Sequence, residues 1–430
     1  HLFQLLSDYD IPGQRLMGYL SFRAMLASVT AMLISFFAGR KIIHWLQKKQ
    51  IGETIRDLGL EGQMQKKGTP TMGGVIILLA IGVSALLFCD LTNIYTQLLI
   101  LTTFWCGGIG FADDYIKVFK HNKEGMSERG KLILQIVLGF IVGLTVCFNN
   151  DIVVREKVKV ETAENGTTYL PQGSDDLDVD SETIVHKSGW KMENIVKSTK
   201  TTLPFIKNHE LDYKWFSPFH GKMGWYFKWA VYVLMIVIVI TACSNGTNLT
   251  DGMDGLAAGT SAIVGTVIGI LAWLSGNLIN SEYLNIMYIP GTGEVAVFMS
   301  VFVGALLGFL WYNSYPAQVF MGDTGSLAIG GIIGVSAILI RKELLLPILC
   351  GIFFVESLSV LIQRFYFKYT RLKYGTGQRI FRMAPLHHHY QKIDIPAKIK
   401  WPSHPVPEAK IVTRFWLVGL ILAVATLADR

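Results

Sequence analysis

The sequence predicts an all-α polytopic protein that crosses a membrane about ten times. Three observations predict it: 51% of the 430 residues are hydrophobic, only 17% are charged, and the mean hydropathy is +0.40. A soluble protein of this size carries about 25% charged residues. Apolar stretches of about 17 to 25 residues, the length that spans a bilayer, recur along the chain. A transmembrane β-barrel would show short alternating segments instead.

The predicted spans divide the chain into three parts. They lie at residues 20–45, 72–89, 95–112, 132–148, 225–243, 256–276, 295–312, 325–340, 344–367 and 412–428. Residues 1–149 hold the first four spans, residues 150–224 form a polar insert, and residues 225–430 hold the remaining spans. The five cysteines lie in or beside apolar stretches, so we expect small buried hydrophobic side chains rather than disulfides.

The distribution of Lys and Arg predicts the orientation of the spans. Loops after odd-numbered spans are basic, whereas short loops after even-numbered spans hold little beyond Arg341 and Lys342. Because Lys and Arg accumulate on the cytoplasmic side, we expect cytoplasmic odd loops and two extracytoplasmic termini. The net charge of +7 then describes a basic inner face, suited to anionic headgroups or phosphorylated substrates. No aromatic-basic module accompanies this charge, which argues against nucleic acid as a partner.

The insert at 150–224 is predicted to be a small β-rich extracytoplasmic unit. VREKVKVETAENGTTYL alternates in polarity and contains Asn165-Gly166, a signal for a two-residue hairpin turn. GSDDLDVDSE at 173–182 is expected to be a flexible acidic loop, because the spacing of an EF-hand calcium site is absent.

Acidic and amide side chains gather where the spans reach the predicted cytoplasmic side: Asp113, Asp114, Asn248, Asp251, Asp254 and Asp323. The spacing of Asn248, Asp251 and Asp254 would place them near one face of a helix. Carboxylates this close to the membrane core need a polar cavity or a cation. Mg²⁺ meets that need, since it typically uses one or two carboxylates plus substrate phosphates. Any one of these acids is explained as well by capping a helix as by binding a metal. Only the whole set indicates a metal site.

Glycines and basic residues accompany these acids. Glycines at positions 252, 255, 322 and 325 allow backbone N–H groups to approach a phosphate. Three consecutive histidines follow Pro385, but neighbours in sequence rarely ligate one ion and no cysteine is near, which disfavours zinc. Phosphate partners are expected among His387–His389, Lys66, Lys117, Arg379 and Arg382, although any of these bases could be a solvated charge. The set predicts a Mg²⁺-dependent enzyme for a phosphorylated substrate at the cytoplasmic membrane surface.

In order along the chain, GTPTMGG, ADDYIKV, SNGTNLTDGMDGLAAG, PAQVFMGDTGSLAIGG and APLHHHY resemble the motifs of the phospho-N-acetylmuramoyl-pentapeptide transferase family. That family belongs to the polyprenyl-phosphate N-acetylhexosamine-1-phosphate transferase superfamily, and APLHHHY resembles the muramoyl-pentapeptide branch. The resemblance implies that UDP-MurNAc-pentapeptide and undecaprenyl phosphate react, with Mg²⁺, to give undecaprenyl-diphospho-MurNAc-pentapeptide (lipid I) and UMP. It also implies peptidoglycan synthesis at the bacterial cytoplasmic (inner) membrane, a site facing the cytoplasm, and a homodimer. The insert is longer than the loop usual for the family.

The resemblance further implies a role for each motif residue. The catalytic residues would be Asp113, Asp114, Asp323 and His387, with Asp113 the candidate base. Asp323 would ligate Mg²⁺, helped by Asp114 and Asp251. Substrate would be bound by Lys66, Thr71, Lys117, Asn248, Asp251, Asp254, Asn313, Phe320, His387, His388 and His389, with Phe320 stacking on uracil. The base role stays open, because a phosphate monoester with a second pKa of about 6 can attack unaided. One-step and two-step transfer also stay open.

Two alternative functions remain at this point. A polyprenyl-phosphate GlcNAc-1-phosphate transferase would use the same metal chemistry with a different sugar pocket. A cation-coupled membrane transporter would also collect carboxylates, but near the middle of several spans. The interiors of the predicted spans hold few acids, with Glu356 the main exception.

Overall fold

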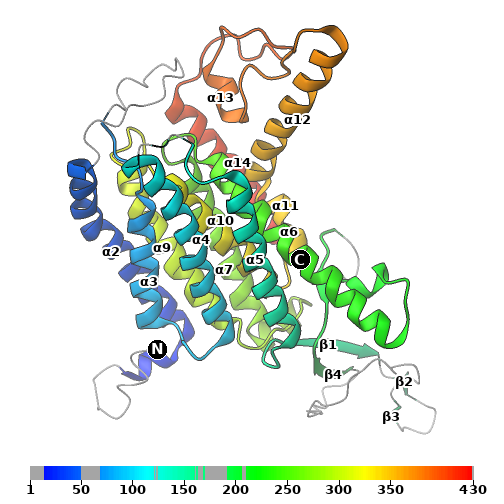
Figure 1. Ribbon diagram of the computed structural model, residues 1–430. Coiled ribbons are helices and arrows are strands. Elements are labelled where there is room, and N and C mark those ends of the chain that lie inside the picture. The colour runs from blue at the N-terminus through cyan, green and yellow to red at the C-terminus, as the bar shows by residue number, and fades with distance from the viewer. Residues whose placement is uncertain are drawn as a thin grey trace.

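The computed structural model describes residues 14–49, 68–120, 122, 124–159, 161–162, 168–169, 191–205 and 210–428. Within these residues, eight helices are long and apolar enough to cross a membrane, and a bent helix pair adds a ninth candidate span. The helices pack into one bundle (Figure 1), which confirms a polytopic helical membrane protein.

The spanning helices are α2 (Leu20–Lys49), α4 (Ile94–Phe119), α5 (Glu128–Phe148), α6 (Gly221–Thr250), α7 (Leu256–Ser275), α9 (Gly293–Asn313), α10 (Gly322–Leu339) and α14 (Glu408–Ala428). The short helix η1 (Gln14–Gly18) precedes them, and short elements between them are η3 (Tyr213–Phe216), α8 (Leu278–Tyr283) and α13 (Leu386–Gln391).

Two predicted spans differ from the rest. The second is α3 (Gly74–Phe88), whose 15 residues, at about 1.5 Å each, fall short of a hydrocarbon core of roughly 30 Å. The ninth is broken, because η4 (Glu343–Leu345) and α11 (Leu346–Leu349) meet α12 (Gly351–Tyr374) at 78°. The prediction of about ten continuous spans is therefore only partly confirmed.

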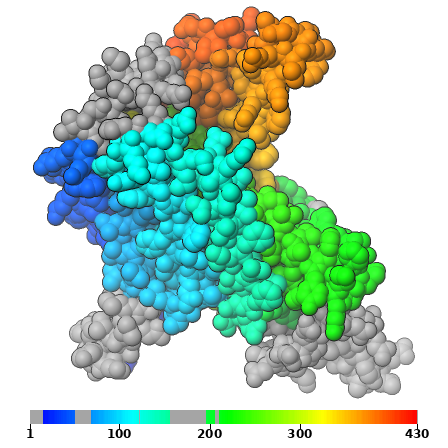
Figure 2. Space-filling view, viewed as in Figure 1, coloured from blue at the N-terminus to red at the C-terminus, as the bar shows by residue number. Residues whose placement is uncertain are grey.

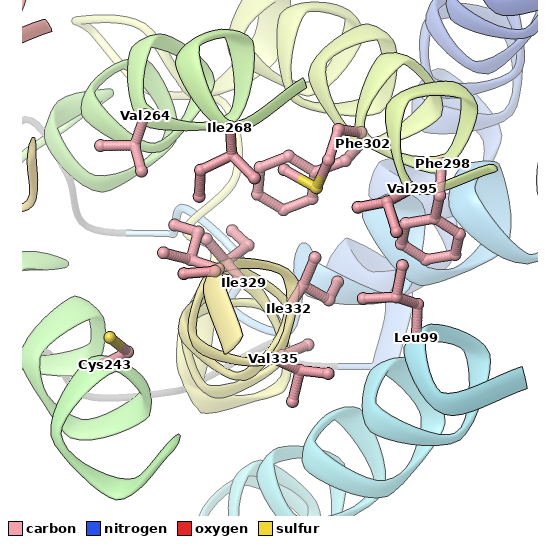
Figure 3. Packing of buried hydrophobic residues seen from close by; sticks show 14 of the residues in the cluster. Leu99, Cys243, Val264, Ile268, Val295, Phe298, Phe302, Ile329, Ile332 and Val335 are labelled. Atoms are coloured by element: carbon pink, nitrogen blue, oxygen red, sulfur yellow. The ribbon is translucent and has the colours of Figure 1, made fainter. Parts of the chain in front are cut away.

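Helix α10 lies at the centre of the bundle and is the most enclosed of the spanning helices. Its Ile329, Ile332 and Val335 face side chains from α4, α6, α7 and α9, such as Leu99, Cys243, Ile268 and Phe302 (Figure 3). Glycines let neighbouring helices approach its backbone closely. A methyl group at Gly330 would collide with Cys243 and Ser244 of α6.

The same kind of approach joins α3, α4 and α10 at the end that carries the acids. A methyl group at Gly110 of α4 would collide with the Asp323 carbonyl group, and one at Gly74 of α3 would collide with Gly325. Helix packing therefore fixes where Asp323 lies relative to α4.

The polar insert lies at the opposite end of the bundle from α13 (Figure 1). Its described residues form three antiparallel pairs: β1 (Val154–Lys159) with β4 (Lys191–Val196), β2 (Glu161–Thr162) with β3 (Thr168–Tyr169), and β5 (Lys200–Thr202) with β6 (Glu210–Asp212). The backbone N–H of Thr202 donates to the Arg341 carbonyl oxygen at 3.0 Å, which attaches the insert to the loop after α10. The Asn165-Gly166 turn and the acidic loop at 173–182 lie outside the described residues.

Helix α12 and the loop that follows it stand out from the bundle, in orange in Figure 2. Apolar side chains such as Phe354, Leu361 and Phe365 are exposed along α12. A row of exposed apolar side chains along one helix is expected to face lipid rather than water.

The glycine contacts predict a difference in stability between two single-methyl variants. Gly330→Ala should lower the free energy of unfolding by about 1 to 3 kcal/mol, because the methyl group has no space against the α6 backbone. Gly108→Ala is the matched control, since a methyl group added at Gly108 on α4 would meet no atom of the described residues within 4 Å beyond its own helix backbone and chain neighbours. It should be neutral or gain up to about 1 kcal/mol from helix propensity. Thermal unfolding in detergent measures both, and equal melting temperatures would contradict the packing of α10 on α6.

Candidate active site

Asp113 and Asp114 on α4 and Asp323 on α10 form an acidic cluster, with ligand oxygens within 4.8 Å of one another. Asp113 is 0% exposed and Asp114 is 3% exposed. The predicted span at 95–112 stops just before these two acids, whereas helix α4 continues to Phe119 and holds both acids inside it. The sequence correctly predicted that the acids of α4 and α10 meet.

Asp114 receives three hydrogen bonds from the start of α10. The backbone N–H groups of Asp323 and Thr324 donate to it at 3.1 and 2.9 Å, and the Thr324 hydroxyl group donates at 2.6 Å. A carboxylate suits this place, because the first N–H groups of a helix lack intrahelical partners. Gly322 turns the chain into α10 with φ of +73°. A Cβ there would lie 3.0 Å from the Thr71 hydroxyl oxygen, so the predicted substrate residue Thr71 borders the cluster.

Two lysines bridge the other two acids. Lys117 Nζ lies 2.5 Å from Asp113 and 3.4 Å from Asp323, while Lys131 Nζ lies 2.9 Å from Asp113 and 2.6 Å from Asp323. The Asn248 amide group donates to Asp323 Oδ1 at 2.9 Å. Lys117 and Asn248 are thus in the site as predicted. Lys131, from the first turn of α5, was not singled out, and its only signal in the sequence was positive charge after the ADDYIKV motif.

Asn248, Asp251 and Asp254 do not share a helix face, so that expectation is wrong. Helix α6 ends at Thr250, with Asp251 as its C-cap residue, and Asp254 lies in the turn before α7. Gly255 takes φ of +78° in that turn, a conformation that an α-helix does not contain.

Asp251 lies near the cluster but outside the group of closest oxygens. Desolvation raises the pKa of Asp251 well above its usual range, and repulsion from the Asp323, Asp114 and Asp254 carboxylates adds to it. A backbone hydrogen bond from Gly322 works in the opposite direction. A cation beside these acids would offset that repulsion and favour the charged form of Asp251.

Asp254 and Asn313, both predicted to bind substrate, hold the loop between α9 and α10. Asp254 Oδ2 accepts a hydrogen bond from the Ala317 N–H at 3.0 Å. Asn313 accepts from the Gly255 N–H at 3.1 Å and donates to the Val319 carbonyl oxygen at 2.9 Å. Both side chains are buried. In this arrangement their contacts support the loop that carries Phe320.

The GTPTMGG segment is paired with that loop through its backbone. Phe320 N–H donates to the Pro70 carbonyl oxygen, and Gly73 and Gly74 donate to the carbonyl oxygens of Phe320 and Met321, each at 2.8 Å. Phe320 is half-buried beside Thr71 and the start of α10. Lys66, predicted to bind phosphate, lies outside the described residues.

The three consecutive histidines lie in different surroundings. His387 is completely buried, and its backbone N–H donates to Glu356 at 3.2 Å. His388 is half-buried, with Nδ1 3.1 Å from the Gln391 amide oxygen. A methyl group at Gly252 would collide with His387 Nε2, so His387 faces the turn that carries Asp251.

His389 instead holds the loop after α12. Its Nδ1 accepts a hydrogen bond from the Arg382 N–H at 3.0 Å, so its Nε2 donates to the Trp401 carbonyl oxygen at 2.8 Å. Burial lowers the pKa of His389, consistent with a neutral ring. The Arg382 guanidinium donates to the carbonyl oxygens of Lys392, Pro402 and Lys400. Arg382 and His389 are therefore engaged within the loop rather than facing the cluster.

The donor set of the cluster fits a hard divalent cation. Carboxylate oxygens are the ligands that Mg²⁺ prefers, with waters or substrate phosphates completing its shell. The Asp114 carboxylate already accepts hydrogen bonds from the start of α10. Asp113 and Asp323 instead form ion pairs with lysine ammonium groups, and an incoming cation or phosphate can displace these lysines from the carboxylates. The site can therefore bring a cation, anionic oxygens and two lysines together at one end of the bundle.

Comparisons with known proteins agree with this site. Residues 190–341 match the family described as glycosyl transferase family 4, and residues 66–78 match the first signature of phospho-N-acetylmuramoyl-pentapeptide-transferases. The chain is 53% identical over 430 residues to the phospho-N-acetylmuramoyl-pentapeptide-transferase of Parabacteroides distasonis, covering 99% of this chain and 98% of that protein.

Proteins of the same name from Porphyromonas gingivalis and Flavobacterium psychrophilum are 51% and 50% identical, with 98% of each relative covered. These matches cover 100% and 99% of this chain, so their length includes the polar insert. The chain belongs to the phospho-N-acetylmuramoyl-pentapeptide-transferase family.

Proposed function

We propose that this protein transfers phospho-MurNAc-pentapeptide from UDP-MurNAc-pentapeptide to undecaprenyl phosphate, giving lipid I and UMP in peptidoglycan synthesis. The observation that carries the proposal is the acidic cluster of Asp113, Asp114 and Asp323 beside Lys117 and Lys131. Phosphoryl transfer needs positioning and charge neutralisation more than covalent chemistry by the protein. A cluster of acids and lysines at the end of a membrane bundle provides both.

The proposed cofactor is Mg²⁺, held by Asp323 with Asp114 and Asp251 nearby. When bound, it would neutralise diphosphate oxygens and the UMP leaving group. Lys117 and Lys131 would move from the carboxylates to the phosphate oxygens of the substrates, and Asn248 would keep Asp323 oriented. Phe320, half-buried on the loop held by Asn313, is the proposed surface for uracil.

A direct attack by the lipid phosphate is the proposed route. Asp113 accepts a hydrogen bond from the Met126 N–H at 2.7 Å and contacts both lysines, so its carboxylate is well placed to orient them. The attacking phosphate, with a second pKa of about 6, does not require Asp113 as a base.

We also propose that the site faces the cytoplasm, in a protein of the bacterial inner membrane whose termini and insert face outward. The basic odd-numbered loops support this orientation. So does the position of the described strands of the insert, which lie at the opposite end of the bundle from α13 (Figure 1), whose His387 faces the turn that carries Asp251. A homodimer is proposed from family membership, and a mass measurement in detergent would test it.

Substrate choice and metal dependence can be measured together as UMP release by the purified protein with undecaprenyl phosphate. We expect release with UDP-MurNAc-pentapeptide and Mg²⁺, none after EDTA, and recovery when Mg²⁺ is restored. UDP-GlcNAc should not support release. Release with UDP-GlcNAc alone would assign the protein to the GlcNAc-1-phosphate branch, and release unaffected by EDTA would contradict the metal.

Asp323→Asn should lower kcat at least about 100-fold, because an amide replaces the charge that holds the cation and both lysines. Asp90→Asn is the matched control. Asp90 lies between α3 and α4 at the other end of the bundle, where its side chain accepts hydrogen bonds from the Thr92 N–H and hydroxyl groups. An amide oxygen can replace that acceptor, and the backbone N–H that donates to Glu294 is unchanged. Asp90→Asn should keep normal turnover, whereas equal effects of the two variants would contradict the assignment of Asp323.

A further inference from the structure

Glu356 is a buried acid on α12 that the proposed reaction leaves without a role. Its side chain is 0% exposed. A buried carboxylate in a membrane protein is costly unless donors or a charge partner face it. In the part of the chain that the structure describes, His387 faces this carboxylate with both its backbone N–H and its ring.

The contact fixes how the His387 ring is turned. Its Nδ1 lies 3.2 Å from Glu356 Oε2, and both side chains are 0% exposed. A carboxylate can only accept, so the ring proton belongs on Nδ1. The lone pair is then on Nε2, at the far side of the ring. Within the described residues, both ring nitrogens are buried and neither makes an aligned hydrogen bond: Nδ1 meets Glu356 as a close charge contact, and Nε2 meets no polar partner.

That unpaired nitrogen is directed to the proposed active site. Nε2 lies against Gly252, where a methyl group would collide with it. Gly252 follows Asp251, whose carboxylate is close enough to Asp114 and Asp323 to be repelled by them. His387 therefore presents an acceptor atom at the edge of the acidic cluster, at a turn that only glycine leaves open.

We propose that Glu356 is a positioning residue that keeps the His387 proton on Nδ1, so that Nε2 accepts a hydrogen bond from a hydroxyl or N–H group of the sugar nucleotide. The inference rests on the proposed function and deepens it. The same logic governs other carboxylate–histidine pairs, in which the carboxylate selects the tautomer and the orientation of the ring.

The competing explanation is structural: Glu356 would merely accept the His387 N–H at the start of α13. Glu356→Gln separates the two. The glutamine oxygen can still accept from the backbone N–H, which preserves any capping role. Its NH₂ group would face Nδ1 and force the ring proton to Nε2, replacing an acceptor with a donor toward the substrate. Glu356→Asp retains a carboxylate and is the conservative variant.

The first test is kinetic. Glu356→Gln should lower kcat/KM for UDP-MurNAc-pentapeptide about 10- to 100-fold, with the KM for undecaprenyl phosphate nearly unchanged. Glu356→Asp should recover part of the loss. Because Glu356 acts through His387, adding Glu356→Gln to His387→Asn should cost little more than His387→Asn alone. Equal kcat/KM in Glu356→Gln and the wild type, or losses that multiply in the double variant, would overturn the proposal.

The second test does not depend on activity. Ring-nitrogen NMR of histidine-labelled protein, with His387→Asn used to assign the signal, should show the proton on Nδ1 in the wild type and on Nε2 in Glu356→Gln. A proton that stays in place would overturn the inference even if turnover falls. A wild type that forms no lipid I would contradict the proposed function instead, while the NMR result would still decide the tautomer.

Discussion

The structure of the site depends on the hydrogen bonds that Asp114 of α4 accepts from the start of α10. Helix α10 has no capping side chain of its own, so an acid from a distant segment takes that place. The bonds are possible because Gly110 lets the two backbones touch. Buried hydrogen bonds to a charged group are stronger than neutral ones, and losing them would leave an unsatisfied carboxylate. Packing of α4 on α10 therefore determines where Asp113 and Asp323 meet.

Much of this arrangement could be predicted from the sequence. The composition predicted a helical membrane protein, and the five motifs contained the three acids that meet. Asp113, Asp114 and Asp323 were found because acids beside apolar segments are rare and need a common explanation. Lys117 belonged to the same motif, so it was found with them.

The rest depended on tertiary contacts. Lys131 and Glu356 lie outside the motifs, and only packing brings each to a functional side chain. The prediction that Asp254 shares a helix face with Asn248 was wrong, because α6 ends at Thr250 and the chain turns at Gly255. A motif also does not reveal which way a side chain faces. Both ring nitrogens of His389 form hydrogen bonds within its own loop.

The proposed reaction requires that Asp323, with Asp114 and Asp251 nearby, holds one cation. Binding of Mn²⁺, followed by electron paramagnetic resonance in the presence of UDP-MurNAc-pentapeptide and without lipid phosphate, tests it most directly. A single saturable Mn²⁺ per chain that is displaced by Mg²⁺ and lost in Asp323→Asn is the result expected. Equal Mn²⁺ binding by the wild type and Asp323→Asn would contradict the claim.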